Sequence, residues 1–356
     1  MQNAVQNWEV LERFVPLTPE ERLGCIQTQK LFRLRLTPYV LSLVDAGHPH
    51  CPIRRQAIPL PQEVGQGEGE LEDPLGEEKY RPVEALVHRY ADRALLLCTD
   101  SCPMYCRHCT RRRLTRGGRP LGEGAWAQAL EYIAARPGIR EVILSGGEPG
   151  LLSDEVLGGL LGRLRAIAHV EVIRLGTRVP VTLPMRITRP FARLLRRHAP
   201  LFVITHFNHP KEVTPEAARA CSLLVDAGVP VENQAVLLRG INSSVRILEA
   251  LFVACLRMRV RPYYLHQMDL AQGTWHLRTP LRFGLEAMEA LSGRVSGLAM
   301  PAFAVDLPGG GGKVRLGPEA VVSWEGGHTV LKNHEGHHYI YPEPPEADCH
   351  CPYEEI

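Results

Sequence analysis

The middle of the chain alternates between short apolar runs and longer stretches with apolar residues at helical spacing. Six runs predict strands, over 94–98, 141–146, 170–177, 201–207, 231–238 and 261–267. Five stretches between them predict helices, over 122–136, 154–168, 189–199, 214–228 and 244–258. Strands that alternate with helices of this length form βαβ units around a parallel sheet. About six such units predict an α/β fold, a partial or closed β/α barrel, whose chemistry gathers at the carboxyl ends of the strands.

The residues on either side of this alternation have a different character. The N-terminal stretch is helical and loop-rich, with a helix start at Thr18. The stretch from Pro61 to Pro82 is acidic and rich in Gly and Pro, which predicts a long surface connection. Beyond about residue 314, prolines and histidines predict a small β-rich or irregular extension. The predicted division is therefore a helical N-terminal region at 1–85, the barrel at 86–314 and a C-terminal extension at 315–356.

The composition narrows the class of protein. The 41 basic residues nearly cancel the 39 acidic ones, for a net charge of +2. Proteins that bind nucleic acids usually show a clear basic excess, so we expect no nucleic-acid partner. The first residues contain no basic stretch followed by an apolar core, and no apolar run approaches the length of a membrane span. We therefore expect a cytoplasmic protein without a membrane partner.

The ten cysteines are of two kinds. In a reducing compartment, cysteines are more often thiols or metal ligands than disulfides. Five stand among apolar or helical residues and predict small buried side chains: Cys25, Cys51, Cys98, Cys221 and Cys255. The other five are clustered and need a chemical explanation: Cys102, Cys106 and Cys109, and near the C-terminus Cys349 and Cys351.

The strongest motif is Cys102-x-x-x-Cys106-x-x-Cys109, directly after the first predicted strand. Three close thiolates can hold three irons of a cubane cluster and leave the fourth iron open for catalysis. On spacing alone, a zinc site that lacks its fourth ligand and buried free cysteines stay open as alternatives. At the end of the second strand lies a Ser-Gly-Gly-Glu-Pro run, where glycines allow a ligand close to the backbone.

These two motifs in this order resemble the radical S-adenosylmethionine superfamily. The resemblance implies a [4Fe-4S] cluster on the three cysteines and S-adenosylmethionine on the open iron. It places His108 beside the adenine, and the carboxylate of Glu148 near the ammonium of the cofactor. The residues that it places around S-adenosylmethionine are His108, Ser145, Gly146, Gly147, Glu148, His206 and Gln234.

Several longer segments resemble lysine 2,3-aminomutase, from about His88 to the C-terminus: CPMYCRHCTRRR, LGTRVPVTLPMRIT, HFNHPKEVTPEAARACSLLVDAGVPVENQAVLLRGIN, RVRPYY and VDLPGGGGK. The resemblance implies that Lys313 forms a Schiff base with pyridoxal phosphate, while Arg89, Tyr90 and Arg93 bind that cofactor. Glycines before Lys313 predict a flexible loop that lets the lysine swing away. Without the resemblance, a surface turn at Lys313 and solvated arginines at Arg89 and Arg93 stay open.

The resemblance also implies the substrate contacts. Arg111 would bind the substrate carboxylate with its guanidinium fork. Asp269 and Asp306 would receive the far ammonium of lysine. The implied reaction interconverts L-lysine and β-lysine through a 5′-deoxyadenosyl radical and a pyridoxal phosphate aldimine. We expect an amino acid as substrate, an electron donor to the cluster and a homo-oligomer.

The sequence departs from the family at two places. The family has a zinc site that links subunits, but Ser244 and Glu354 stand where two of its cysteines would be. Cys349 and Cys351 are the two that remain. They still offer ligands to a zinc ion, but we expect the zinc site to be absent rather than retained. His266 replaces a tyrosine, as in relatives that modify a lysine of translation elongation factor P.

Free lysine is the first prediction for the substrate, because the chain has the C-terminal extension and the full glycine run that those relatives generally lack. The alternatives are a lysine of elongation factor P and another amino acid. A non-catalytic iron–sulfur or zinc protein that binds a partner is the alternative of a different class, and a metal centre without cofactor cleavage would identify it.

Overall fold

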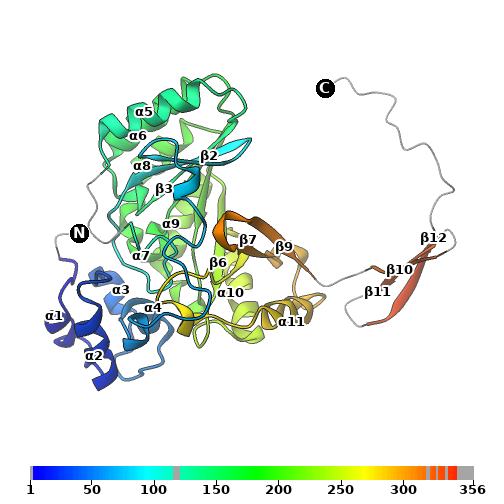
Figure 1. Ribbon diagram of the computed structural model, residues 1–356, viewed down its shortest axis with the longest axis horizontal. Coiled ribbons are helices and arrows are strands. Elements are labelled where there is room, and N and C mark those ends of the chain that lie inside the picture. Colours follow the sequence, from blue (N-terminus) through cyan, green and yellow to red (C-terminus); the bar gives the residue numbers. More distant parts are fainter. Residues whose placement is uncertain (1–2, 115–120, 318–320, 326–327, 333–335, 343–356) are drawn as a thin grey trace.

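The protein is described here by a computed structural model, which covers residues 3–114, 121–317, 321–325, 328–332 and 336–342. Nine strands form one sheet in chain order, and the strands from β2 to β8 pair in parallel (Figure 1). The parallel strands are β2 (Arg93–Thr99), β3 (Glu141–Gly146), β4 (Val172–Gly176), β5 (Leu201–Thr205), β6 (Val231–Leu237), β7 (Arg261–Gln267) and β8 (Ala302–Leu307). The sheet is an open β/α barrel, which confirms the predicted fold class.

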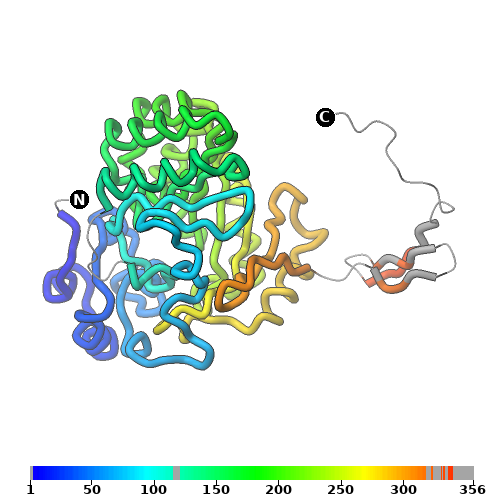
Figure 2. The backbone as a smooth tube through the Cα atoms, turned by 45° about the horizontal axis from the view of Figure 1, so that its top comes forward, coloured from blue at the N-terminus to red at the C-terminus, as the bar shows by residue number. Residues whose placement is uncertain are grey.

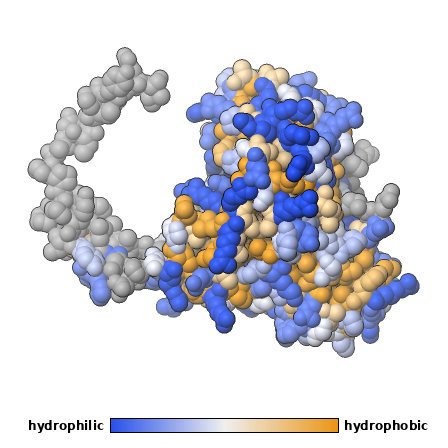
Figure 3. All heavy atoms as spheres, turned by 180° about the vertical axis from the view of Figure 1, so that it is seen from behind, coloured by the Kyte–Doolittle hydropathy of each residue, from blue (hydrophilic) through white to orange (hydrophobic). Residues whose placement is uncertain are grey.

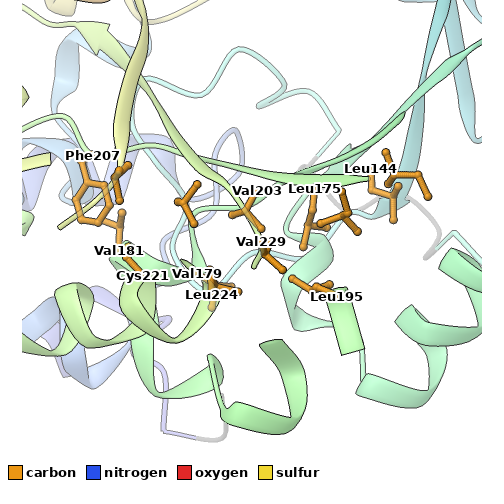
Figure 4. Close-up of a cluster of buried hydrophobic side chains, with 14 of the residues drawn as sticks. Leu144, Leu175, Val179, Val181, Leu195, Val203, Phe207, Cys221, Leu224 and Val229 are labelled. Carbon is orange, nitrogen blue, oxygen red and sulfur yellow. The ribbon is translucent and has the colours of Figure 1, made fainter. Parts of the chain in front are cut away.

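Helices cover the outer face of the sheet. They are α5 (Glu123–Ala134), α6 (Asp154–Arg165), α7 (Val179–Thr182), α8 (Arg189–Arg196), α9 (Pro215–Asp226), α10 (Val245–Arg257) and α11 (Leu281–Leu291). Figure 2 shows the helices between the strands running side by side, and α6 packs on α8 and α8 on α9. Their apolar faces meet the sheet in one continuous core, where Leu144, Leu175 and Val203 of three strands face Leu195 and Leu224 of two helices (Figure 4).

Alternation along the strands directs every second side chain into the barrel. In β6, Val231, Asn233 and Ala235 are buried under the helices, whereas Glu232 and Gln234 line the inner cavity. Successive side chains of a strand point to opposite faces, so the same rule applies to each parallel strand. The six predicted strands are all present. The pattern did not single out β8, which adds a seventh parallel strand.

Two antiparallel strands form the edges of the sheet, β1 (Leu86–Tyr90) and β9 (Gly312–Leu316). Side chains bridge them: Arg89 Nη2 donates to the carbonyl of Gly310 over 2.6 Å, and Lys313 N donates to the Tyr90 hydroxyl over 3.2 Å. The edge strands therefore meet across a seam in the barrel wall.

The N-terminal region contains α1 (Trp8–Glu12), α2 (Pro19–Thr28), α3 (Pro38–Ser42) and α4 (Pro52–Ala57), with the short 3₁₀ turns η1 (Pro61–Glu63) and η2 (Glu78–Tyr80). The helix start predicted at Thr18 is confirmed by a capping box between Thr18 and Glu21.

The prediction of a surface connection after Pro61 is wrong for three of its acidic residues, while Glu68, Glu72 and Glu78 are exposed as predicted. Glu63, Glu70 and Glu77 are all buried. Glu70 accepts from the backbone amides of Gly273 and Thr274, and the other two pair with arginines of the barrel. Composition could not reveal this, because a buried carboxylate depends on partners far away in sequence.

A second sheet follows the barrel, built from β10 (Val321–Glu325), β11 (His328–Lys332) and β12 (His338–Pro342) in antiparallel pairing. The predicted β-rich extension is thus present in part. Across the described residues, no helix has the length and apolar character needed to cross a bilayer. Polar and apolar residues share the face shown in Figure 3.

Candidate active site

One cavity of about 870 Å³ fills the barrel from the carboxyl ends of the strands to the seam. Every predicted site residue within the described part of the chain lines it: Arg89, Tyr90, Arg93, Cys102, Cys106, His108, Cys109, Arg111, Ser145, Gly146, Gly147, Glu148, His206, Gln234, Asp269, Asp306 and Lys313. Cys349 and Cys351, predicted for zinc, lie outside the described residues. The structure thus brings the predicted residues together, while their individual roles stay predictions.

The three clustered cysteines lie on the loop after β2, and all are free thiols. Among the described residues, no three His, Cys, Asp or Glu side chains converge as they would on a single metal ion. A cubane cluster has a different demand, since each cysteine binds its own iron at a separate corner. The loop offers one thiol to each of three irons.

Buried charges surround these thiols. Arg178 Nη1 donates to Cys106 Sγ over 2.8 Å, and its Nη2 pairs with Glu212 at 2.7 Å. Burial and then the charge of Cys109 raise the pKa of Cys102 well above its usual range. Burial also raises the pKa of Cys109. Thiols of this kind lose their protons when they bind a metal, so metal binding here releases protons.

The Ser-Gly-Gly-Glu run ends β3 close to the cysteine loop. Gly146 has a φ of +112°, and a Cβ on Gly147 would lie 2.5 Å from the carbonyl oxygen of Ser101. Neither position accommodates a side chain. Glu148 accepts hydrogen bonds from the amides of Gly150 and Arg178, and burial raises its pKa to about 7. Its carboxyl is thus held at the edge of the cavity.

Two histidines on the cavity wall are neutral. Burial, then the charge of Arg178, lowers the pKa of His108 well below its usual range and that of His206 to about 4. His108 Nε2 lies 3.3 Å from Asn208 Nδ2, and its buried Nδ1 has no hydrogen-bond partner within the described structure. A buried nitrogen without a partner is unfavourable, so a ligand that bonds to it would stabilise the site.

Lys313 lies at the centre of a polar network at the other end of the cavity. Its Nζ donates to Asp306 Oδ2 over 2.5 Å and lies 3.1 Å from His266 Nδ1. His266 Nε2 lies 3.2 Å from Gln234 Oε1. Burial, then the charge of Lys313, lowers the pKa of His266 well below its usual range, so the ring is neutral. A neutral Nδ1 can accept from the ammonium.

The glycine run before Lys313 forms a tight hairpin between β8 and β9. Gly309, Gly310 and Gly312 have φ values of +64°, +87° and +103°, and Lys313 itself stands in β9 opposite Asp306. The run predicted as a flexible loop is thus a hairpin turn in the structure, and its flexibility stays a prediction. Three of its glycines adopt left-handed backbone, which other residues rarely do.

Arginines gather at the seam beside this hairpin. The Arg93 guanidinium carbon lies 4.0 Å from the centre of the Tyr90 ring, and Arg89 lies 5.2 Å from the same ring. Two guanidinium groups and a phenol next to the Lys313 backbone form a positive end of the cavity. Such a group of donors suits a phosphate.

Arg111 and Asp269 lie between the two ends. Arg111 Nε donates to Glu77 over 2.7 Å, and its Nη1 donates to Ser145 Oγ over 3.2 Å. Asp269 accepts from the Thr110 hydroxyl. Burial raises the pKa of Asp269 to about 6, the Thr110 hydrogen bond opposes this, and Asp306 raises it further. The two aspartates therefore feel each other's charge.

Sequence reasoning missed two residues that hold the site together. Arg178 follows β4 in the segment LGTRVP, which was part of the resemblance but received no role. Glu77 lies in the stretch that composition assigned to the surface. In both cases the signal is a charged residue whose burial only the folded chain reveals.

Known proteins and protein families match the sequence of this chain over most of its length. The family model for lysine-2,3-aminomutase matches residues 288–354, and the model for the radical SAM superfamily matches residues 96–250. L-lysine 2,3-aminomutase of Fusobacterium nucleatum is 49% identical, across 97% of this chain and 81% of the relative. The same enzyme of Clostridium subterminale is 46% identical across 99% and 85%. Glutamate 2,3-aminomutase of Clostridioides difficile is 38% identical across 98% and 82%.

Proposed function

Because the chain belongs to the lysine 2,3-aminomutase family of radical SAM enzymes, we propose that it moves the α-amino group of L-lysine to the β-carbon and back. The observation that supports this most directly is the shared position of the predicted residues in one cavity. This cavity unites three cysteines, a lysine amine and two aspartates, groups with no shared purpose in a protein that only binds a partner. Family membership makes the chain an enzyme and removes that alternative.

The residues present fit the groups that the family implies. Three cysteines with an arginine donor at Cys106 would hold the [4Fe-4S] cluster. The glycines and Glu148, with the buried and unpaired Nδ1 of His108, would hold S-adenosylmethionine. When bound, the cluster and S-adenosylmethionine supply an oxidising carbon radical that abstracts hydrogen from the substrate.

We further propose that pyridoxal phosphate binds at the seam, where it would hold the nitrogen that migrates. Lys313 would supply the amine, and Arg89 and Arg93 would bind the phosphate beside Tyr90. The neutral ring of His266 can accept a hydrogen bond from Lys313 Nζ, which orients the amine toward the cavity wall formed by β7 and β8. A cavity of about 870 Å³ has room for both organic cofactors and an amino acid.

The chain's own charges select and orient the substrate. Arg111 would bind its carboxylate, and Asp269 with Asp306 would bind its far ammonium. Fixing both ends of the molecule holds the β-carbon in one place and excludes other hydrogens from reaction.

The two aspartates favour lysine over glutamate, the substrate named for the relative from Clostridioides difficile. The side-chain carboxylate of a glutamate would meet two largely buried carboxyl groups, and like charges in a medium of reduced dielectric repel each other. A lysine ammonium would instead be attracted by both. An electron donor to the cluster and a homo-oligomeric state remain part of the proposal.

Anaerobic turnover tests the proposal. The reconstituted protein would receive pyridoxal phosphate, S-adenosylmethionine, a reductant and L-lysine, and products would be separated by mass-resolved chromatography. We expect β-lysine and 5′-deoxyadenosine, with both lost in Cys106→Ala and β-lysine alone lost in Lys313→Ala. Cleavage of S-adenosylmethionine with untouched lysine would contradict the substrate, and glutamate and elongation factor P would be tried next. An intact cluster without cleavage would contradict the enzyme itself.

A further inference from the structure

Glu77 reaches the cavity from a segment outside the barrel, the strap formed by Asp73–Tyr80. Its side chain is only 5% exposed. One carboxylate oxygen accepts from Arg111 Nε over 2.7 Å and from Arg111 Nη2 over 2.6 Å. The other accepts from Arg113 Nη2 over 3.0 Å. Burial acts to raise the pKa of Glu77, but the two arginines outweigh it and lower that pKa, so the group is ionised.

These contacts fix the plane of the Arg111 guanidinium. Glu77 takes the edge formed by Nε and Nη2, while Nη1 donates to Ser145 Oγ over 3.2 Å. A guanidinium is a rigid fork, so two fixed sides determine where the remaining donors point. Arg111 itself lines the cavity, so the donors that Glu77 and Ser145 leave free are the ones available to a ligand there.

The strap has supports of its own besides Glu77. The amide of Gly309 donates to the Pro74 carbonyl over 3.2 Å, and the amide of Glu78 donates to Asp73 Oδ2 over 2.8 Å. Gly76 has a φ of +63°, and a Cβ there would lie 3.1 Å from the backbone of Gly309. The strap is thus seated on the hairpin that precedes the cavity lysine by contacts that do not involve the Glu77 carboxylate.

We propose that Glu77 is a positioning residue for the carboxylate end of the amino acid substrate, acting through Arg111. The inference rests on the proposed function in one respect, that Arg111 binds this carboxylate. An unheld arginine samples many rotamers, and a substrate would have to order it at a cost in affinity. Because Glu77 already orders Arg111 in the folded protein, the substrate does not have to do so.

The test compares two ligands that differ only in the carboxylate. Binding of L-lysine and of L-lysinamide to the holoenzyme would be measured by calorimetry for the wild type, Glu77→Gln and Glu78→Gln. Glu78 is the matched control, because it belongs to the same strap and its side chain is 54% exposed. We expect Glu77→Gln to weaken lysine binding by about tenfold or more and to leave lysinamide within about twofold, from the loss of an ordered charge-assisted contact.

The kinetic counterpart is a rise of KM with a smaller change in kcat, since the contact is made in the ground state as well. Equal effects on both ligands, or unchanged lysine binding, would overturn the proposal. If Glu77→Gln does not fold, Glu77→Asp replaces it, because it keeps the charge on a shorter side chain. We expect its affinity for L-lysine to be lower than that of the wild type without being lost, and its affinity for L-lysinamide to be unchanged.

Calorimetry also separates the two hypotheses. A wild type that binds lysine without forming β-lysine contradicts the proposed function and still tests Glu77. A wild type that binds another amino acid instead is tested with that amino acid and its amide.

Discussion

The pKa of Asp269 depends on its burial and on two neighbouring residues. It is buried, accepts a hydrogen bond from Thr110 and faces the charge of Asp306. Its position after β7 was readable from the sequence, because carboxyl ends of parallel strands share one edge. Its raised pKa was not, because that depends on burial and on a second carboxylate 37 residues later in the chain, at Asp306. Arg111 is a similar case, since its motif was visible and its partner Glu77 was not.

This pKa predicts how substrate binding depends on pH. With a pKa of about 6 in the folded protein, Asp269 is charged above that pH and loses its charge below it. Lysine binding should therefore weaken as the pH falls below about 6, by up to about tenfold per pH unit. Calorimetry on the holoenzyme would show this slope in the wild type and a weaker, flatter profile in Asp269→Asn. Identical profiles for the two proteins would contradict the assignment.

At the scale of elements, the strands were predictable and the seam was not. Alternating patterns located six parallel strands within a few residues of their observed bounds. The β8–β9 hairpin was hidden, because its glycine run has no side-chain pattern and indicated only a loop. Pairing with β8 places Lys313 opposite Asp306, so the hairpin, and not a free loop, positions the amine.

The hairpin predicts a test by substitution. Gly310 has a φ of +87°, and a Cβ there would lie 3.0 Å from the Tyr80 ring. Gly310→Ala should cost about 1–2 kcal/mol of local stability and weaken pyridoxal phosphate binding, followed by absorbance. Gly159→Ala in α6 is the control, since a Cβ there meets nothing within 4 Å. That variant should raise the free energy of unfolding by up to about 1 kcal/mol. Equal cofactor affinity in both would contradict this account of the hairpin.

At the scale of the molecule, the N-terminal region is tied to the cysteine loop by buried charge. Glu63 is fully buried and pairs with Arg107 at 2.6 Å and Arg112 at 2.5 Å, on either side of the third cysteine. The three predicted regions remain a proposal, with β9 running to Leu316 and so past the suggested boundary near 314. The N-terminal region, in which the sequence shows no functional motif, thus supports the cysteine loop from outside the barrel.

Removal of this charge should destabilise the whole protein. Glu63→Gln leaves two buried arginines without their carboxylate and should cost about 3–5 kcal/mol in the free energy of unfolding. Glu12→Gln is the control, because its pair with Arg22 is largely exposed and worth less than about 1 kcal/mol. Denaturant unfolding of both variants measures the difference. A small loss for Glu63→Gln would show that the N-terminal region does not support the loop.

The central claim is that an amino group moves between neighbouring carbons, and the position of a nitrogen label tests it most directly. The reconstituted protein would be given L-lysine labelled with ¹⁵N only at the α-amino group, and the product would be examined by NMR. We predict β-lysine with all of the label on the β-carbon. Label that remains on the α-carbon, or that is lost to solvent ammonia, would contradict the account.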